Sequence, residues 1–155
     1  MKTTNHNTKK PIVIIDIDGT IAKVPAHRAR LAEQTPPDWV AFYDDSFDDE
    51  AIMPTCDFVR RLTAFYEIMF CTSRKECARQ KTQLWLERKL GFTPEDYTLI
   101  MRPNSDTRPD YIQKIECFKA ETTSEERERV AFVVDDSPTV MLHWRKLGYR
   151  TFLFS

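Results

Sequence analysis

The sequence predicts a three-layer α/β/α fold, in which helices cover both faces of a central parallel sheet. Apolar runs rich in β-forming residues recur along the chain without polar alternation, which is typical of strands buried on both faces. Segments with helical spacing separate these runs, so strands and helices alternate and right-handed crossovers are expected. The 155 residues and the 41% hydrophobic content suit one compact domain with a real core.

The strands are predicted from the apolar runs. They lie at residues 12–15, 68–71, 97–101, 130–134 and 149–154. The first four carry the unbroken hydrophobic pattern of a buried strand, and the fifth closes the chain.

The helices are predicted between the strands. They cover residues 55–66, 75–90, 109–119 and 137–147. Thr55 is expected to cap the first helix, and Gly91 and Gly148 are expected to end the second and the fourth. Proline stands in the first turn of the last two, at Pro109 and Pro138, where its missing N–H costs nothing.

Residues 23–53 break this alternation. We expect them to form a small cap-like insertion after the first strand, over one end of the sheet, because about thirty residues are too few for a large independent domain. Residues 1–10 are polar and are expected to be a loose N-terminus. Residues 11–155 are then expected to form a single domain.

Composition excludes several classes of protein. No run of about 18 apolar residues occurs, and the first ten residues lack the apolar core of a signal peptide, so we expect no membrane span and a cytoplasmic protein. The four cysteines form no C-x-x-C pair, which favours free thiols. The three glycines are too few and too far apart for a P-loop or a dinucleotide fingerprint. The net charge of −1 does not indicate a nucleic-acid binder.

Polar residues follow the predicted strands at the ends where ligands bind in open α/β sheets. Asp16 and Asp18 follow the first strand, Thr72 follows the second, and Asp135 and Asp136 follow the fourth. Carboxylates so close together repel one another unless a cation lies between them. A hard divalent cation with oxygen ligands, most plausibly Mg²⁺, is therefore expected at this edge of the sheet.

Lys114, on a predicted helix, is expected to join this group. A metal, a lysine, a hydroxyl and free backbone amides suit a phosphoryl group, whose transfer needs mainly positioning and charge neutralisation. Aspartate is a known nucleophile towards phosphorus, and a second carboxylate can protonate the leaving oxygen and later activate water.

Four motifs resemble those of the haloacid dehalogenase (HAD) superfamily. They are DIDGT at 16–20, Thr72, Lys114 and DD at 135–136. Further segments resemble the 3′-phosphatase domains of bacteriophage polynucleotide kinase-phosphatases, namely HR at 27–28, DW at 38–39, TSR at 72–74, MR at 101–102 and SDTRPDYIQK at 105–114. The resemblance covers residues 11–152 and implies the Rossmann-like HAD fold with a minimal cap. It also implies phosphomonoester hydrolysis through an aspartyl-phosphate, with Mg²⁺.

The resemblance also implies catalytic roles. Asp16 would be the nucleophile. Asp18 would be the general acid and then the general base, and its backbone carbonyl would bind the metal. Thr72 and the amide of Ser73 would hold the phosphate, and Lys114 would neutralise charge.

Metal and substrate roles follow from the same resemblance. Asp135 would bind the metal directly and Asp136 would support it. Arg28, Arg74 and Asp110 match substrate-binding residues that the phage phosphatase domain needs for activity.

Three functions remain open. A polynucleotide 3′-phosphatase in DNA or RNA end repair is favoured, working beside a separate kinase or ligase, and a phage-encoded version would act in the host cytoplasm. The near-neutral charge keeps a 3′- or 5′-(deoxy)nucleotidase as the alternative. A phosphoacceptor signalling domain is more remote, because receiver domains place their acidic pair first in the chain and their acceptor aspartate later. Oligomeric state is left open.

The insertion and its surroundings carry three further expectations. A basic rim for a nucleic-acid backbone could form from Arg28, Arg30, Arg74, Lys75, Arg79 and Lys81. Arg30 is also the alternative to Arg28 in its substrate role. The acidic run 44–50 is expected to be a solvated face. The three aromatic residues at 39, 42 and 43 are expected to serve burial more than base stacking.

Overall fold

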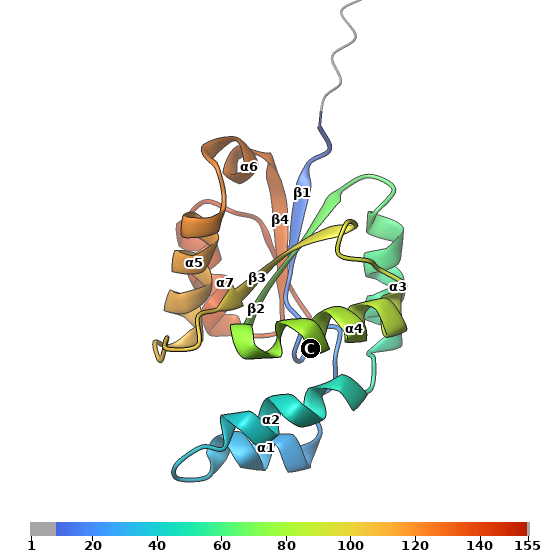
Figure 1. The fold of residues 1–155 in the computed structure, drawn as a ribbon. Coiled ribbons are helices and arrows are strands. Elements are labelled where there is room, and N and C mark those ends of the chain that lie inside the picture. The colour runs from blue at the N-terminus through green and yellow to red at the C-terminus, as the bar shows by residue number, and fades with distance from the viewer. Residues whose placement is uncertain (1–8, 155) are drawn as a thin grey trace, which may run out of the picture.

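A computed structural model describes residues 9–154, in which five parallel strands form one sheet (Figure 1). The strands are β1 (Ile12–Ile15), β2 (Glu67–Lys75), β3 (Tyr97–Arg102), β4 (Val130–Asp135) and β5 (Thr151–Leu153). They lie in the order β3-β2-β1-β4-β5, so β1 and β4 are direct neighbours. The predicted α/β class and parallel sheet are confirmed. The loose N-terminus expected over residues 1–10 falls almost wholly outside the described residues.

Helices cover both faces of the sheet. They are α3 (Met53–Leu62) and α4 (Arg79–Leu90) on one face, with α5 (Asp110–Glu121) and α7 (Pro138–Lys146) on the other (Figure 1). Alternate residues of β1 face opposite layers: Val13 shares a buried cluster with Trp85 of α4, and Ile14 shares one with Trp144 of α7. No helix among residues 9–154 is both long and apolar enough to cross a bilayer.

Two helix ends agree with the predicted signals and one does not. Gly91 adopts a left-handed conformation after α4, with φ 76°, and ends that helix as expected. Gly148 has a φ of 91° and follows the last residues of α7, so it also ends its helix as expected. The prediction that Thr55 caps α3 is wrong, because the helix already begins at Met53 with proline in its first turn, and Thr55 is buried inside it.

Helix α6 (Ser124–Arg129) is an element that the sequence analysis missed. Thr123 and Glu126 form a capping box at its start, in which each side chain bonds to the other residue's backbone. The T-x-x-E pattern that produces this box is present in the sequence and signals a helix start.

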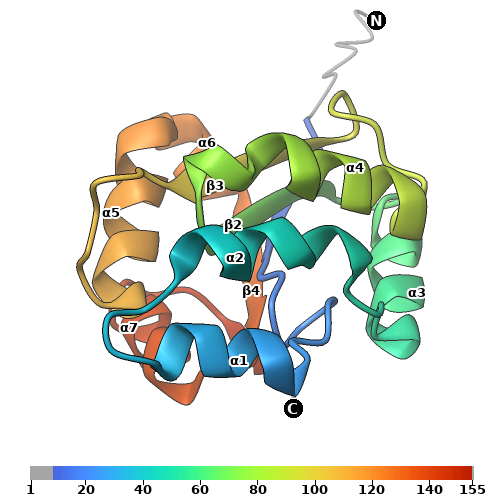
Figure 2. The same cartoon turned by 60° about the horizontal axis from the view of Figure 1, so that its bottom comes forward.

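The insertion after β1 folds into α1 (Ala26–Glu33), α2 (Trp39–Asp44) and the short 3-10 helix η1 (Asp45–Asp48). A second 3-10 helix, η2 (Glu76–Ala78), connects β2 with α4. An antiparallel bridge between Ala22 and Ala51 joins the two ends of the insertion. Helices α1 and α2 lie beyond the carboxyl ends of the strands, as Figures 1 and 2 show. Residues of the insertion therefore face the edge of the sheet where the predicted site lies.

Candidate active site at the carboxyl ends of the strands

Three aspartates meet at the carboxyl edge of the sheet. Asp16 directly follows β1, and Asp135 ends β4 with Asp136 next to it. Because β1 and β4 are paired, these ends lie side by side, and the Asp16 amide donates a hydrogen bond to the Val134 carbonyl at 3.0 Å. One carboxylate oxygen from each aspartate lies within 4.8 Å of the other two. The three side chains could therefore share one metal ion.

Lys114, from α5, lies between two of these carboxylates. Its ammonium donates hydrogen bonds to Asp16 and to Asp135, both at 2.7 Å. All three residues are buried. Burial by itself would lower the pKa of Lys114, but the two carboxylates raise it, so the ammonium stays charged. With all three carboxylates ionised, one positive charge would face three negative ones, and the cluster would keep a negative balance.

A divalent cation fits this balance. Burial raises the pKa of Asp16 well above its ordinary value, against the opposing effect of Lys114, and the nearby Asp135 and Asp136 raise it further. A cation among the oxygens would favour the ionised form of all three carboxylates. Carboxylate oxygens are the ligands that Mg²⁺ prefers, so the donor set suits this ion.

The turn after β1 is shaped around the cluster. Gly19 has a φ of 85°, which favours glycine, and a Cβ atom there would collide with the Asp136 carboxylate. The Thr20 hydroxyl donates a hydrogen bond to Asp16 at 3.1 Å. The DIDGT motif therefore supplies a carboxylate, its hydrogen-bond donor and the space that Asp136 occupies.

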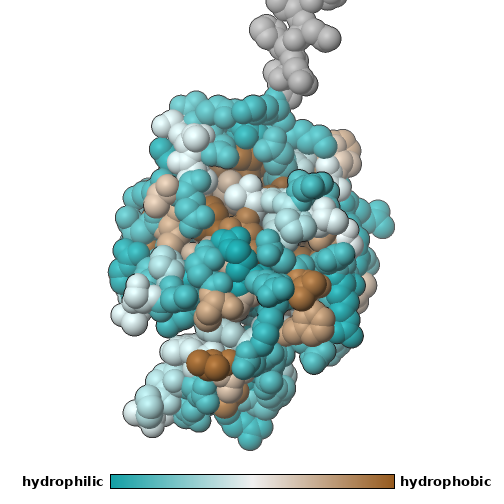
Figure 3. All heavy atoms as spheres, in the orientation of Figure 1, coloured by the Kyte–Doolittle hydropathy of each residue, from teal (hydrophilic) through white to brown (hydrophobic). Residues whose placement is uncertain are grey.

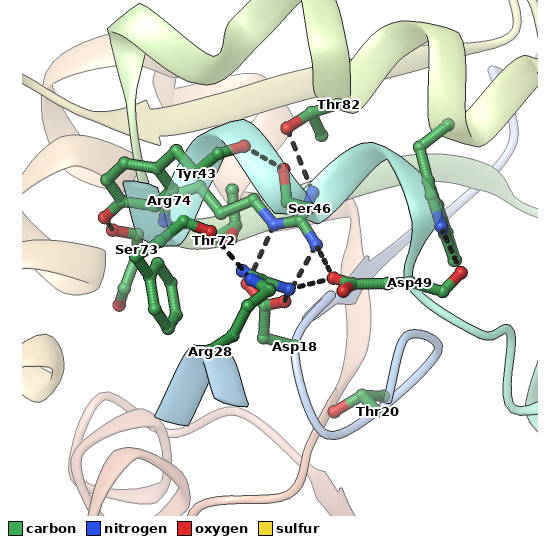
Figure 4. Close-up of polar contacts among 12 residues, drawn as sticks. Asp18, Thr20, Arg28, Tyr43, Ser46, Asp49, Thr72, Ser73, Arg74 and Thr82 are labelled. Atoms are coloured by element: carbon green, nitrogen blue, oxygen red, sulfur yellow. Dashed lines mark hydrogen bonds and ion pairs between the residues drawn. The ribbon is translucent and has the colours of Figure 1, made fainter. Parts of the chain in front are cut away.

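Asp18 lies outside this cluster and faces the insertion. Arg74 binds its carboxylate in a two-pronged pair, with Nε and Nη2 each 2.8 Å from an oxygen (Figure 4). Burial would raise the pKa of Asp18, but Arg74 and Arg28 together hold it below its ordinary value. The Asp18 carboxylate is therefore ionised and oriented. The metal role predicted for Asp18 uses its backbone carbonyl and stays a prediction.

Arg28 and Arg74 are joined by a third acidic residue, Asp49. Its Oδ2 accepts hydrogen bonds from Arg28 Nη1 and, at 3.3 Å, from Arg74 Nη2 (Figure 4). The side chains of both arginines are 0% exposed and that of Asp49 is 1% exposed. Arg28 also lies over the Phe42 ring, 4.2 Å from its centroid. The insertion and β2 are thus connected through a buried ionic network.

This network corrects two expectations. Asp49 is buried, so the run 44–50 is not a solvated face throughout, although Asp44, Asp45 and Asp48 are exposed. Arg28 and Arg74 are buried as well, so neither can belong to an exposed basic rim. The physical reason is the same in both cases: each charge finds its partner inside the protein. Sequence reasoning missed Asp49 because nothing in an acidic run marks the one acidic residue that turns inward.

Two further rim candidates are paired with acidic residues. Arg79 pairs with Glu76 at 2.7 Å, and Lys81 pairs with Asp44. Arg30 is exposed, and Lys75 is half-buried. The rim expected from six basic residues is therefore reduced to isolated positive charges.

The other predicted site residues surround Arg74 and the space beside it. Thr72 is buried, and its hydroxyl accepts a hydrogen bond from the Arg74 amide at 3.2 Å. Ser73 follows, and its buried hydroxyl has no hydrogen-bond partner among residues 9–154. Asp110, at the start of α5, accepts a hydrogen bond from Arg102 at 2.5 Å. Arg102 ends β3 and also donates to the Ser73 carbonyl at 3.2 Å, a positioning contact that the sequence analysis did not identify.

A cavity of about 370 Å³ opens beside Asp18. Residues from the insertion, the end of β2 and the loop between β3 and α5 line it, and they include Trp39, Tyr43, Ser73, Arg102 and Asp110. Four of the predicted site residues therefore belong to its wall: Asp18, Ser73, Arg74 and Asp110.

Comparison with known sequences identifies the family. Residues 10–154 match the family described as the polynucleotide kinase PNKP phosphatase domain. A relative from Autographa californica nuclear polyhedrosis virus, named as a bifunctional polynucleotide kinase/RNA ligase, is 32% identical over 146 residues. These residues cover 90% of this chain but only 18% of the viral protein.

Solved structures show the same fold. A chain of the Pnkp1/Rnl/Hen1 RNA repair complex superposes with a TM-score of 0.73 at 24% identity, and the match covers 99% of this chain and 47% of that one. A HAD-like hydrolase from Streptococcus pneumoniae superposes with a TM-score of 0.62 at 11% identity, covering 94% of this chain and 85% of the hydrolase.

The family match covers nearly the whole chain and includes every residue of the site described above. The expected resemblance to HAD phosphatases and to polynucleotide kinase-phosphatases is confirmed. This chain belongs to the HAD-type phosphatase domains of the polynucleotide kinase PNKP family.

Proposed function

We propose that this protein is a Mg²⁺-dependent phosphomonoesterase that removes the 3′ phosphate from a nucleic-acid end. The observation that carries the proposal is the buried arrangement in which Lys114 bonds to Asp16 and Asp135 at 2.7 Å beside Asp136. Such a site holds a nucleophile, a fixed positive charge and a set of metal ligands within one hydrogen-bond network. Membership of the PNKP phosphatase family supports a polynucleotide substrate.

Asp16, Asp135 and Asp136 would hold the cation, together with the backbone carbonyl of Asp18. When bound, Mg²⁺ would neutralise the charge of the phosphate oxygens and of the carboxylates around them. Gly19 leaves the room that Asp136 needs to reach this position.

The reaction would proceed in two displacements. An Asp16 oxygen attacks phosphorus and the bond to the 3′ oxygen breaks, while Asp18 gives that oxygen its proton. Water then attacks the aspartyl-phosphate, Asp18 takes the proton of the water, and inorganic phosphate leaves with Asp16 restored. Lys114 offsets the charge that gathers on phosphate and nucleophile.

Arg74 links this cycle to substrate binding. In the structure it holds Asp18 as a carboxylate, the form that the base step requires. If Arg74 moves from Asp18 to the phosphate, Asp18 is released to carry a proton for the acid step. The Thr72 hydroxyl and the backbone amide of Ser73 belong to the same end of β2 and would bind phosphate oxygens.

Arg28 and Asp110 would act by positioning. Arg28 lies 3.9 Å from Asp18 and pairs with Asp49, which in turn bonds to Arg74, so its contribution to substrate binding passes through Asp18 and Arg74. Asp110 fixes Arg102 beside the Ser73 carbonyl.

The biological setting is also a proposal. The chain spans less than a fifth of the viral kinase/ligase relative and about half of the repair-complex chain. We propose that residues 11–155 form one phosphatase domain that works in the cytoplasm beside a separate or fused kinase or ligase. The names of these relatives support that setting, since one combines kinase and ligase and the other belongs to an RNA repair complex.

Phosphate release from a panel of substrates tests the proposal. The panel contains a 3′-phosphorylated oligonucleotide, a 5′-phosphorylated one and free 3′- and 5′-mononucleotides, each with Mg²⁺ and with a chelator. We expect the highest kcat/KM for the 3′-phosphorylated oligonucleotide and loss of turnover with the chelator. A preference for free mononucleotides would support the nucleotidase alternative. A single stoichiometric release without turnover would support a phosphoacceptor domain.

A further inference from the structure

We propose that the cavity beside Asp18 binds the unpaired terminal nucleobase of the substrate, with Trp39 as its stacking surface. This inference rests on the proposed function, because it assigns the part of the substrate that carries the phosphate. It goes further by naming a residue for base recognition and by requiring an end whose last nucleotide is not base-paired.

Trp39 differs from the other aromatic residues of α2. Tyr43 is only 6% exposed and Phe42 is partly buried, so both serve the core as expected. Trp39 is 39% exposed and also lines the cavity. Its ring stacks on Tyr43 at 6.2 Å with an interplanar angle of 23°, and the edge-on Phe42 ring is 5.5 Å away. Trp39 is thus an aromatic surface supported from behind and open to the cavity.

The wall around Trp39 carries charges that suit a nucleotide. Arg74 and Arg102 are fixed by carboxylate partners, Asp18 and Asp110. Lys75 lines the cavity and has no ion-pair partner among residues 9–154. A positive charge without a partner, beside a phosphate site and an aromatic surface, is the combination with which proteins bind single-stranded nucleic acid. We therefore assign Lys75 to the next phosphate of the strand.

The size and position of the cavity limit what can enter. A volume of about 370 Å³ lies at the low end of the range of small-ligand pockets, about 300–1,000 Å³, and suits one nucleoside rather than a base pair. The cavity lies between the insertion and the sheet edge, next to Asp18. A nucleotide whose phosphate reaches Asp16 can place its base here only after it leaves a duplex.

Figure 3 shows the hydropathy of one face of the molecule. Most of this face is hydrophilic, with separate apolar spots. Phe65 is 71% exposed but lies in the turn before β2, at the opposite edge of the sheet. It is therefore a suitable control for an exposed aromatic residue without a role in binding.

The test combines a change in the protein with a change in the substrate. Two 3′-phosphorylated oligonucleotides are compared, one complete and one lacking only its last base. The Kd of each is measured by fluorescence anisotropy with Mg²⁺, in an Asp16→Asn background so that no turnover occurs. KM and kcat are measured with the active enzyme. Each measurement is repeated with Trp39→Ala, Trp39→Phe and Phe65→Ala.

We expect Trp39→Ala to weaken binding of the complete oligonucleotide about tenfold, the loss typical of one base–aromatic stack. The same variant should leave binding of the abasic oligonucleotide unchanged, because the contact it removes is already missing. KM should rise by a similar factor while kcat stays within about twofold. Trp39→Phe should keep most of the affinity, and Phe65→Ala should match the parent protein.

An equal loss with complete and abasic oligonucleotides would overturn the assignment, because Trp39 would then act only on the fold of the insertion. Equal kcat/KM for a blunt duplex end and a single-stranded end would overturn the requirement for an unpaired base. Absence of turnover with any 3′-phosphorylated substrate would refute the proposed function instead. The binding comparison would still decide the role of Trp39 in that case.

Discussion

Asp49→Ala is expected to be the most destabilising substitution in the acidic run 44–50. The change leaves Arg28 and Arg74 buried, with side chains that are 0% exposed. Asp18 becomes their remaining acidic partner, 3.9 Å from Arg28. Removing one partner from a buried ion pair typically costs about 3–5 kcal/mol of the free energy of unfolding. For a protein of this size that corresponds to a fall in Tm of about 6–20 °C.

Denaturant unfolding with Asp48→Ala as the control measures this cost. Asp48 is the neighbour in the chain, its side chain is 83% exposed, and its ion pair with Arg88 spans 3.3 Å. An exposed pair of this kind contributes below about 1 kcal/mol. Asp49→Asn keeps a hydrogen-bond acceptor without the charge and should fall between the two. Equal unfolding free energies for Asp49→Ala and Asp48→Ala would refute the reasoning that Asp49 joins the two arginines in a buried network.

Three further predictions concern the metal cluster and the cavity wall. Lys114→Met should lower the free energy of unfolding by about 3–5 kcal/mol without Mg²⁺, and added Mg²⁺ should restore part of this loss. The control Lys119→Met, on the exposed side of the same helix, should change the free energy of unfolding by less than about 1 kcal/mol. Equal effects of the two substitutions would contradict the buried role of the Lys114 amine. Gly19→Ala should weaken Mg²⁺ binding in calorimetry by about tenfold or more, while Gly91→Ala, with a similar positive φ and nothing within 4 Å, should leave Mg²⁺ affinity unchanged. Hydrogen bonds from its arginine neighbour lower the pKa of Asp106 to about 2. Because its pKa is lowered in the folded protein, the ionised Asp106 stabilises the fold above about pH 4, where an ordinary aspartate titrates. This contribution disappears as the pH falls through about 2. An NMR titration that gives an ordinary pKa for the Asp106 carboxyl would contradict its pairing with the arginine.

The parts of the fold that follow local rules could be predicted from the sequence. Uninterrupted apolar runs identified the strands because a strand covered on both faces has no polar side. Gly91 marked a helix end because its left-handed conformation needs a residue without a side chain. The convergence of Asp16, Asp135 and Asp136 followed once the sheet was taken to be parallel, since the carboxyl ends of paired strands meet at one edge.

The parts that depend on contacts distant in the sequence could not be predicted. Asp49 differs from Asp48 only in its surroundings, because Arg28 and Arg74 meet it from other segments. The place of the two arginines in an expected basic rim is wrong for the same reason. The exposure of Trp39 also depends on how α2 lies over the sheet edge, which no pattern in the sequence specifies.

The proposed mechanism depends on Asp16 as the nucleophile of a metal-assisted phosphatase. The most direct test compares phosphate release from the 3′-phosphorylated oligonucleotide by the unchanged protein, by Asp16→Asn and by Asp57→Asn, an exposed control on α3. We predict that Asp16→Asn loses turnover by about a thousandfold or more, with circular dichroism unchanged, and that Asp57→Asn stays fully active. Near-normal turnover by folded Asp16→Asn would contradict the role of Asp16 as the nucleophile.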